Sequence, residues 1–311
     1  MKAIMMMDYG VSEALQEQEI AKPELKENEA LVEMYVTTLN SGDHLILTGA
    51  FRNVVPLRLP HILGIEIAGI VREVGEKVTR VKPGDRVIGL LPTGGGYAEY
   101  VAVDETGLAV IPPTLSFQET AALSAVGLTA WQSLFRFGNL QSGQRILIHA
   151  GAGAVGHIAV QLAKQHGAYV IATARAHNHE FVRQLGADEV IDYNTTDFAE
   201  SVSPVDMVLD MVRDGGETER KSYTVLKDGG KLLSLVSPMI GQNERIRGIE
   251  ALFVRPQPSN SDWSSLIRYV QEQKLKVHID RIFPFTAKGV AEAHQAGEAS
   301  KKGQLLICRN V

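Results

Sequence analysis

Residues 150–156 read Ala-Gly-Ala-Gly-Ala-Val-Gly, and this segment constrains the fold more than any other part of the 311-residue chain. Its glycines fit the pattern G-x-G-x-x-G. An apolar run that ends at His149 precedes it, and an amphipathic segment reaching about His166 follows. A tight turn between a strand and a helix lets a pyrophosphate approach the backbone and the N–H groups at the helix N-terminus. The pattern therefore predicts a dinucleotide-binding turn; the alternative is a glycine-rich turn in another kind of α/β protein.

The residues around this turn alternate between strand-like and helix-like segments. We expect strands at 145–149, 169–173, 189–192, 205–211 and 231–236, with helices between them. Such alternation is typical of a doubly wound parallel sheet. The first 115 or so residues differ, because short apolar or alternating runs are separated by turn signals such as Lys82-Pro83-Gly84-Asp85. This part predicts a small β-barrel or sandwich, so the chain is expected to hold two domains.

The end of the second predicted strand indicates which dinucleotide binds. An NAD site usually has Asp or Glu about 20 residues after the glycines, on the ribose 2′-hydroxyl. Here the strand ends in Ala174 and Arg175, and the first acid that follows is Glu180. Because a guanidinium suits a phosphate, the sequence favours NADP, with Arg175 at the 2′-phosphate. The alternative is a solvated surface arginine.

Charge and composition exclude several classes of protein. With 31 Lys and Arg against 36 Asp and Glu, the formal net charge is −5, which gives no support to broad nucleic-acid binding. The uncharged stretch 146–163 contains histidines and glycines, so we predict no membrane span. The first residues lack the layout of a signal peptide, and the single cysteine, Cys308, cannot form an internal disulfide. A reducing cytoplasm is therefore the expected compartment.

Further motifs, together with the glycine-rich turn, resemble the medium-chain dehydrogenase/reductase superfamily, and its zinc-independent, quinone oxidoreductase-like branch most of all. The resemblance covers nearly the whole chain in order. The matching segments are 63–69, 74–75, 84–87, 95–100, 127–130, 150–156, 161–164, 185–188 and 191–193. It implies a chaperonin-10-like β-barrel catalytic domain plus a doubly wound parallel-sheet Rossmann domain. The expected boundaries are 1–117 for the N-terminal catalytic part, 118–255 for the Rossmann domain and 256–311 for the return to the catalytic domain. The resemblance also implies a homodimer.

The zinc ligands of the metal-dependent relatives have no match here. Their Gly-His-Glu segment corresponds to Gly64-Ile65-Glu66, and their upstream cysteine ligand corresponds to Asn40. The four-cysteine structural lobe has no counterpart, so no metal is expected. The only close histidine pair, His177 and His179, is a possible surface metal site or, as the blander alternative, two polar loop residues.

The resemblance implies hydride transfer from NADPH to an electrophilic small molecule, either a quinone or an α,β-unsaturated carbonyl. Asn40 and Asp43 match a family Asn-x-x-Asp motif near the nicotinamide, where they are expected to bind the substrate oxygen or order a water. The alternative role for both is loop capping. Leu45 stands where quinone reductases of this group often have Tyr, which leaves the acceptor open. Tyr97 is either another hydroxyl for the cleft or a packed barrel tyrosine.

The cofactor contacts are carried over from the family residue by residue. Thr129 is expected beside the nicotinamide, and Lys302 or its neighbour Lys301 near the phosphate. The family's lysine just past the 2′-phosphate position is Asn178 here. The remaining expected contacts are Gly153, Ala154 and Val155 at the pyrophosphate, Ala174 and Arg175 at the 2′-phosphate, Tyr193 at the adenosine phosphate, Val236 and Ser237 at the cofactor edge, and Phe253 and Val254 at the nicotinamide amide.

Three functions remain open at this point. The first is an NADPH-dependent reductase of quinones or conjugated carbonyls. The second is an NADP-binding redox sensor or structural protein with little turnover. The third is a metal-free alcohol dehydrogenase.

Overall fold

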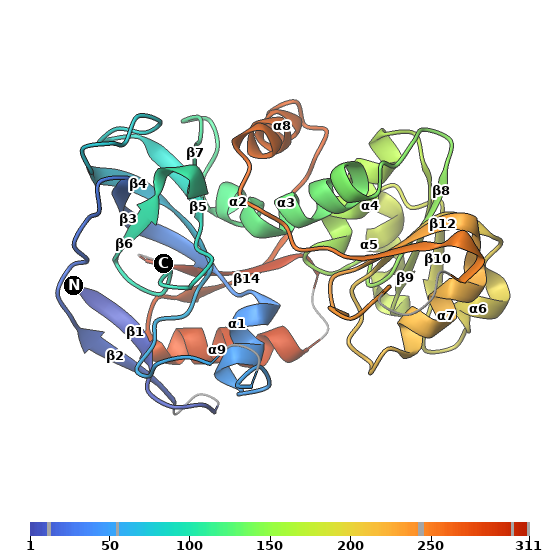
Figure 1. Ribbon diagram of the computed structural model, residues 1–311, viewed down its shortest axis with the longest axis horizontal. Helices are drawn as coiled ribbons and strands as arrows, with labels where there is room; N and C mark the ends of the chain where they lie inside the picture. Colours follow the sequence, from blue (N-terminus) through green and yellow to red (C-terminus); the bar gives the residue numbers. More distant parts are fainter. Residues whose placement is uncertain (11–13, 54–55, 242–245, 300–301, 310–311) are drawn as a thin grey trace. The chain divides into compact units, whose positions relative to one another are not determined.

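A computed structural model describes residues 1–10, 14–53, 56–241, 246–299 and 302–309. The chain divides into two compact units (Figure 1). Unit 1 comprises Met1–Ala125, Pro258–Gln271 and His278–Val311, and unit 2 comprises Val126–Gln257 and Glu272–Val277. The divisions at residues 125 and 257 lie 8 and 2 residues beyond the expected 117 and 255. Residues 272–277 group with unit 2, whereas the sequence placed them in the C-terminal return.

Unit 1 is built on a seven-stranded sheet to which both ends of the chain contribute. The strand order is β14-β15-β3-β4-β5-β7, and β6 also pairs with β3. A separate two-stranded sheet joins β1 and β2. The strands are β1 (Lys2–Met6), β2 (Leu15–Glu19), β3 (Glu29–Thr38), β4 (Glu66–Val74), β5 (Arg86–Leu90), β6 (Tyr100–Asp104), β7 (Leu108–Val110), β14 (Ile279–Pro284) and β15 (Gln304–Cys308).

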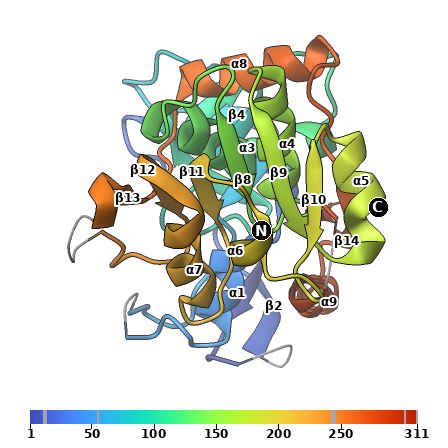
Figure 2. The same cartoon turned by 90° about the vertical axis from the view of Figure 1, so that its right-hand side faces the viewer.

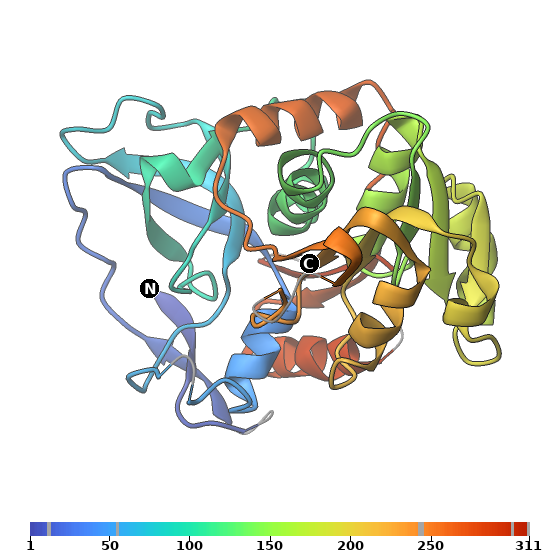
Figure 3. The ribbon, with the colours of Figure 1, turned by 45° about the vertical axis from the view of Figure 1, so that its right-hand side comes forward.

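The helices of unit 1 are α1 (Ser41–Leu47), α2 (Phe117–Ala121), α8 (Asn260–Gln271) and α9 (Ala287–Glu298). Figure 3 shows α1, in blue, beside α9, in red, although they are far apart in the sequence. Helix α2 begins with a capping box: the Ser116 hydroxyl accepts from the Glu119 amide at 3.1 Å, and the Glu119 carboxylate accepts from the Ser116 amide at 3.0 Å. Helix α3 (Ser124–Trp131) follows it and runs into unit 2.

Unit 2 is the parallel sheet that the alternation predicts. Its order is β10-β9-β8-β11-β12-β13, so the direction of strand addition reverses between β8 and β11 (Figure 2). In such sheets ligands bind at the carboxyl ends of the strands on either side of this reversal. The strands are β8 (Arg145–Ile148), β9 (Tyr169–Ala174), β10 (Glu189–Asp192), β11 (Val205–Asp210), β12 (Leu226–Ser234) and β13 (Glu250–Phe253). Its helices include α4 (Gly156–Gln165), α5 (His179–Gln184), α6 (Phe198–Ser201) and α7 (Glu217–Val225).

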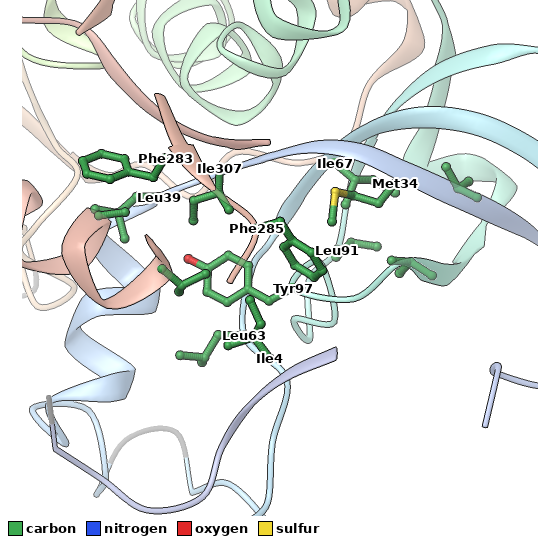
Figure 4. Close-up of a cluster of buried hydrophobic side chains, with 14 of the residues drawn as sticks. Ile4, Met34, Leu39, Leu63, Ile67, Leu91, Tyr97, Phe283, Phe285 and Ile307 are labelled. Atoms are coloured by element: carbon green, nitrogen blue, oxygen red, sulfur yellow. The ribbon is translucent and has the colours of Figure 1, made fainter. Parts of the chain in front are cut away.

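The hydrophobic core of unit 1 joins residues from the beginning, middle and end of the sequence. Ile4, Tyr97 and Ile307 are fully buried members of one cluster (Figure 4). Strand β15 pairs antiparallel with β3, with Ile307 opposite Thr37. The C-terminal strand is therefore an interior part of this sheet and packs into its core.

We expect Ile307→Ala to destabilise unit 1 by about 2–5 kcal/mol, because it opens a cavity in a closely packed core. Ile282→Ala on the neighbouring strand is the control: this side chain is 43% exposed, so its loss should cost about 0.5 kcal/mol or less. Urea unfolding followed by Trp263 fluorescence in a Trp131→Phe background measures both, since these are the two tryptophans of the chain. Equal midpoints for the two variants would contradict the assignment of β15 to the core.

Candidate functional site

The glycine-rich turn connects β8 to α4. Within it the start of α4 lies close to the Ala150 carbonyl, and Gly151 lies close to β9. A Cβ on Gly156 would lie 2.2 Å from the Ala150 carbonyl oxygen, and one on Gly151 would lie 2.8 Å from the Ala172 Cβ. Larger residues at either position would force the helix or the neighbouring strand away. Ala150 itself has a φ of +52°, in the left-handed region. Val155, which precedes the first turn of α4, makes no side-chain capping bond. The turn thus offers a helix N-terminus suited to an anion.

The ends of β9 and β10 carry the two residues expected near the adenosine. The Arg175 Nε donates to the Tyr193 hydroxyl at 2.8 Å, and both side chains are exposed. Ala174 is the last residue of β9 and is buried. The structure therefore brings Arg175 and Tyr193 together at the carboxyl edge of the sheet, with the guanidinium accessible to an anion.

A cavity of about 410 Å³ lies at the carboxyl ends of β11 and β12. Val236 and Ser237 line it, as do Asp210 and Arg213. The Ser234 hydroxyl accepts from the Val236 and Ser237 amides at 3.2 and 3.1 Å, which fixes the backbone at the end of β12. Burial raises the pKa of Asp210 to about 6. Sequence reasoning missed Asp210, although an acid at the end of an apolar predicted strand is a visible signal.

The other expected cofactor residues are placed as follows. Val254 is buried, and its amide donates to the Ser234 carbonyl at 2.9 Å; Phe253, at the end of β13, is 39% exposed. Thr129 is buried on α3 in unit 2. Lys302 belongs to unit 1, where its amide donates to the Asp280 carboxylate at 3.4 Å; Lys301 lies outside the described residues. Gly153 and Ala154 lie in the glycine-rich turn, before α4 begins.

Asn40 and Asp43 both lie at the start of α1 in unit 1. Asn40 caps this helix: its Oδ1 accepts from the Gly42 amide at 2.9 Å, and its Nδ2 is 3.4 Å from the Glu66 Oε1. Asp43 is 1% exposed and accepts from the Gly64 amide at 3.0 Å. Burial raises the pKa of Asp43 to about 7. The capping role is thus observed for Asn40, and its amide remains close to a carboxyl group.

Glu66 is the buried group that joins this cluster, and the sequence analysis gave it no role. It is fully buried at the start of β4; its Oε1 accepts from the Thr38 hydroxyl and its Oε2 from the Ala125 amide, both at 2.8 Å. Burial raises its pKa above the ordinary value for a glutamate. The signal was present in the sequence, because Glu66 is the one charged residue in the apolar run 62–71.

Tyr97 packs in the core of unit 1 rather than presenting an exposed hydroxyl. It is fully buried among apolar side chains (Figure 4). Its hydroxyl lies 3.5 Å from both the Thr38 carbonyl and the His294 Nε2. Burial raises its pKa well above the ordinary value, so the hydroxyl stays protonated. The packed-tyrosine alternative therefore describes this residue.

Metal sites and membrane-spanning helices were sought among the residues that the structure describes. Among them, no three His, Cys, Asp or Glu side chains come together as a metal site. His179 contacts the Ala174 carbonyl at 3.2 Å. No helix in the described ranges is both long enough and apolar enough to span a membrane.

Comparisons with known proteins cover almost the whole chain. Residues 26–113 match the family described as "Alcohol dehydrogenase GroES-like domain", and residues 185–303 match "Zinc-binding dehydrogenase". The chain is 37% identical over 304 residues to the "Quinone-oxidoreductase homolog, chloroplastic" of Spinacia oleracea. The matched region covers 92% of this chain and 92% of the relative. It is 34% identical to the "NADPH-dependent alkenal/one oxidoreductase, chloroplastic" of Arabidopsis thaliana, which covers 94% of this chain and 75% of the relative.

Comparison with solved structures supports the same family. The Escherichia coli quinone oxidoreductase, whose structure was solved in complex with NADPH, superimposes with a TM-score of 0.87 at 27% identity, covering 99% of this chain and 100% of the other. The expected architecture, a GroES-like domain with a Rossmann domain, is confirmed. The chain therefore belongs to the quinone oxidoreductase-like branch of the medium-chain dehydrogenase/reductase superfamily, a family of oxidoreductases.

Proposed function

We propose that this protein is a zinc-independent reductase that uses NADPH to transfer hydride to a quinone or an α,β-unsaturated carbonyl. The observation that carries the proposal is the glycine-rich turn beside the reversal point of the sheet, with Arg175 rather than an acid at the end of β9. The names of two relatives point the same way, one to quinones and one to NADPH with alkenals or enones. A homodimer in the cytoplasm is part of the proposal, supported by the family resemblance and the single cysteine, Cys308.

The residues of unit 2 fit a dinucleotide. Gly151 and Gly156 let the turn and the start of α4 pack against Ala172 and the Ala150 carbonyl, and the N-terminus of α4 offers N–H groups to a pyrophosphate. Arg175 holds the 2′-phosphate, with its guanidinium oriented by Tyr193. Val236 and Ser237, which line the cavity beyond the end of β12, would contact the edge of the cofactor. When bound, NADPH supplies the hydride, and the protein supplies orientation.

The residues of unit 1 serve the acceptor. Ile65 and Asn40 occupy the positions of the family's zinc ligands, so a hydrogen-bond donor must replace the Lewis acid. The Asn40 amide carries two protons; one faces the Glu66 carboxyl at 3.4 Å, and we assign the other to the acceptor oxygen. Asp43, with a pKa of about 7, can hold a proton near neutral pH.

An NADPH-consumption assay tests the proposal directly. With 1,4-benzoquinone in one sample and a simple conjugated enone in another, we expect turnover with NADPH, slower turnover with NADH and no effect of a chelator. The faster acceptor defines the subclass. If NADPH binds but neither acceptor consumes it, the redox-sensor alternative is favoured; if an alcohol is oxidised with NADP and no acceptor is reduced, the metal-free alcohol dehydrogenase is favoured.

Arg175→Ala should lower kcat/KM for NADPH about 10- to 100-fold and leave that for NADH nearly unchanged, because only NADPH presents a 2′-phosphate to the lost guanidinium. Steady-state kinetics with both cofactors measures the two values. Arg183→Ala is the matched control, since Arg183 is also an exposed arginine, on α5. A similar loss for both cofactors would mean that Arg175 does not read the 2′-phosphate.

The variant Asn40→Ser distinguishes the helix-capping role of Asn40 from its proposed role in binding the acceptor. Serine also caps helices well, so the free energy of unfolding should change by about 0.5 kcal/mol or less. Because serine lacks the amide donor, kcat/KM for the acceptor should fall about tenfold. Urea unfolding and acceptor kinetics are compared on the same preparation. Wild-type kinetics in Asn40→Ser would reduce Asn40 to a helix cap.

A further inference from the structure

His149 is a buried histidine to which the proposed reaction gives no role. It follows the last residue of β8 and immediately precedes the glycine-rich turn, and only 1% of its surface is exposed. Its Nδ1 lies 3.3 Å from the Thr173 hydroxyl on β9, and its Nε2 lies 3.2 Å from the Ser222 hydroxyl on α7. Thr173 and Ser222 are buried residues as well, at 2% and 0% exposure. The imidazole thus bridges a helix and a strand.

The partners at each end fix the direction of every hydrogen bond. The Ser222 hydroxyl lies 2.7 Å from the Thr218 carbonyl, which can only accept, so Ser222 donates there. Ser222 must then accept from the His149 Nε2–H. A neutral imidazole protonated at Nε2 accepts at Nδ1, so the Thr173 hydroxyl donates to it. This leaves the Thr173 oxygen to accept from the Ala150 amide, 3.1 Å away.

We call this chain of hydrogen bonds, from the Ala150 amide through Thr173 and His149 to Ser222, the relay. Its bond at the turn holds Ala150, whose backbone lies in the left-handed region. Ala150 has a φ of +52°, and a non-glycine residue adopts that region only when its surroundings hold it there. Its amide is held by the Thr173 side chain, while the Thr173 carbonyl accepts from the Gly151 amide at 2.9 Å. The Ala150 carbonyl in turn accepts from the Gly153 amide at 2.9 Å. The position of the Thr173 hydroxyl therefore affects the backbone of the whole turn.

We propose that His149 is a positioning residue: as the neutral Nε2–H tautomer, it links the glycine-rich turn, through Thr173, to α7 by a chain of hydrogen bonds that all donate in that direction, and so sets the affinity of that turn for the pyrophosphate of the dinucleotide. The inference rests on the proposed function, in which the turn binds NADPH. His149 acts through the backbone of Ala150 and makes no contact with the cofactor.

The surroundings of His149 keep the imidazole neutral. Burial lowers its pKa to about 3, and Asp214 opposes this shift only in part. The ring of Phe198 on α6 packs edge-on against it, with centroids 4.6 Å apart. A cationic histidine that contacted phosphate directly would behave differently, because it would titrate near its ordinary pKa of about 6.5 and bind more tightly at low pH.

Nitrogen NMR of the histidines in the full-length, cofactor-free protein tests the relay on its own. The His149 signals, assigned by their absence in His149→Gln, should show a protonated Nε2 and an unprotonated Nδ1, unchanged between pH 5 and 8. Titration of His149 in this range, or a proton on Nδ1, would overturn the inference whatever the protein catalyses.

Direct NADPH binding, measured by fluorescence titration, tests the consequence. Thr173→Val removes the hydroxyl and should weaken binding about tenfold, whereas Thr173→Ser keeps it and should bind within about twofold of wild type. In turnover, the effect of Thr173→Val is expected in KM for NADPH rather than in kcat. Wild-type affinity in Thr173→Val would overturn the positioning role alone. Failure of the wild-type protein to bind NADPH would overturn the proposed function and, with it, this role.

Discussion

The approach of α4 to the carbonyl of Ala150 is the constraint on which unit 2 depends. Only a residue without a Cβ fits at Gly156, where the next atom would lie 2.2 Å from that oxygen. Because the helix begins this close to the end of β8, its N-terminus opens at the carboxyl edge of the sheet. The cavity beside β11 and β12 and the Arg175–Tyr193 pair lie at the ends of other strands along this same edge. The steric requirement at Gly156 thus places the start of α4 at the edge where we propose that the dinucleotide binds.

The arrangement of β3, β4 and α1 in unit 1 depends instead on buried polar groups that bond to one another. Burying a carboxyl group is costly unless hydrogen bonds compensate it, and Glu66 receives bonds from the Thr38 hydroxyl and the Ala125 amide. These partners come from β3 and α3, so the carboxyl group ties a strand and a helix to the start of β4. Asn40 joins the same group to the cap of α1. The region expected to serve the acceptor is therefore held by a connected set of polar contacts.

Local sequence patterns predicted most strands and helices of unit 2. A parallel α/β sheet arises from alternating strand-like and helix-like segments, and one glycine pattern marks its dinucleotide-binding turn. The capping box at Ser116 is equally local, because both of its partners lie within the four residues 116–119. The sequence did not predict β13 or α1, which are short and have weak periodicity. Nor did it predict the relay through His149 or the bonds of Glu66, because their partners lie 24 to 73 residues away in the sequence. The return of the chain to unit 1 came from the family resemblance, with Pro256 and Pro258 marking its place, since nothing local in β15 indicates that it pairs with β3.

The pairing of β15 with β3 has a consequence for synthesis on the ribosome. Every strand of unit 2 lies between residues 145 and 253, so its sheet can form as soon as that stretch has emerged. The sheet of unit 1 has to wait for residues 304–308, long after β3 has left the exit tunnel. Domains generally fold as units during translation, and exposed strand edges invite aggregation. The part made first is thus the part completed last, and in the interval only residues 36–38 of β3 lack their partner, since β6 already pairs with residues 29–33.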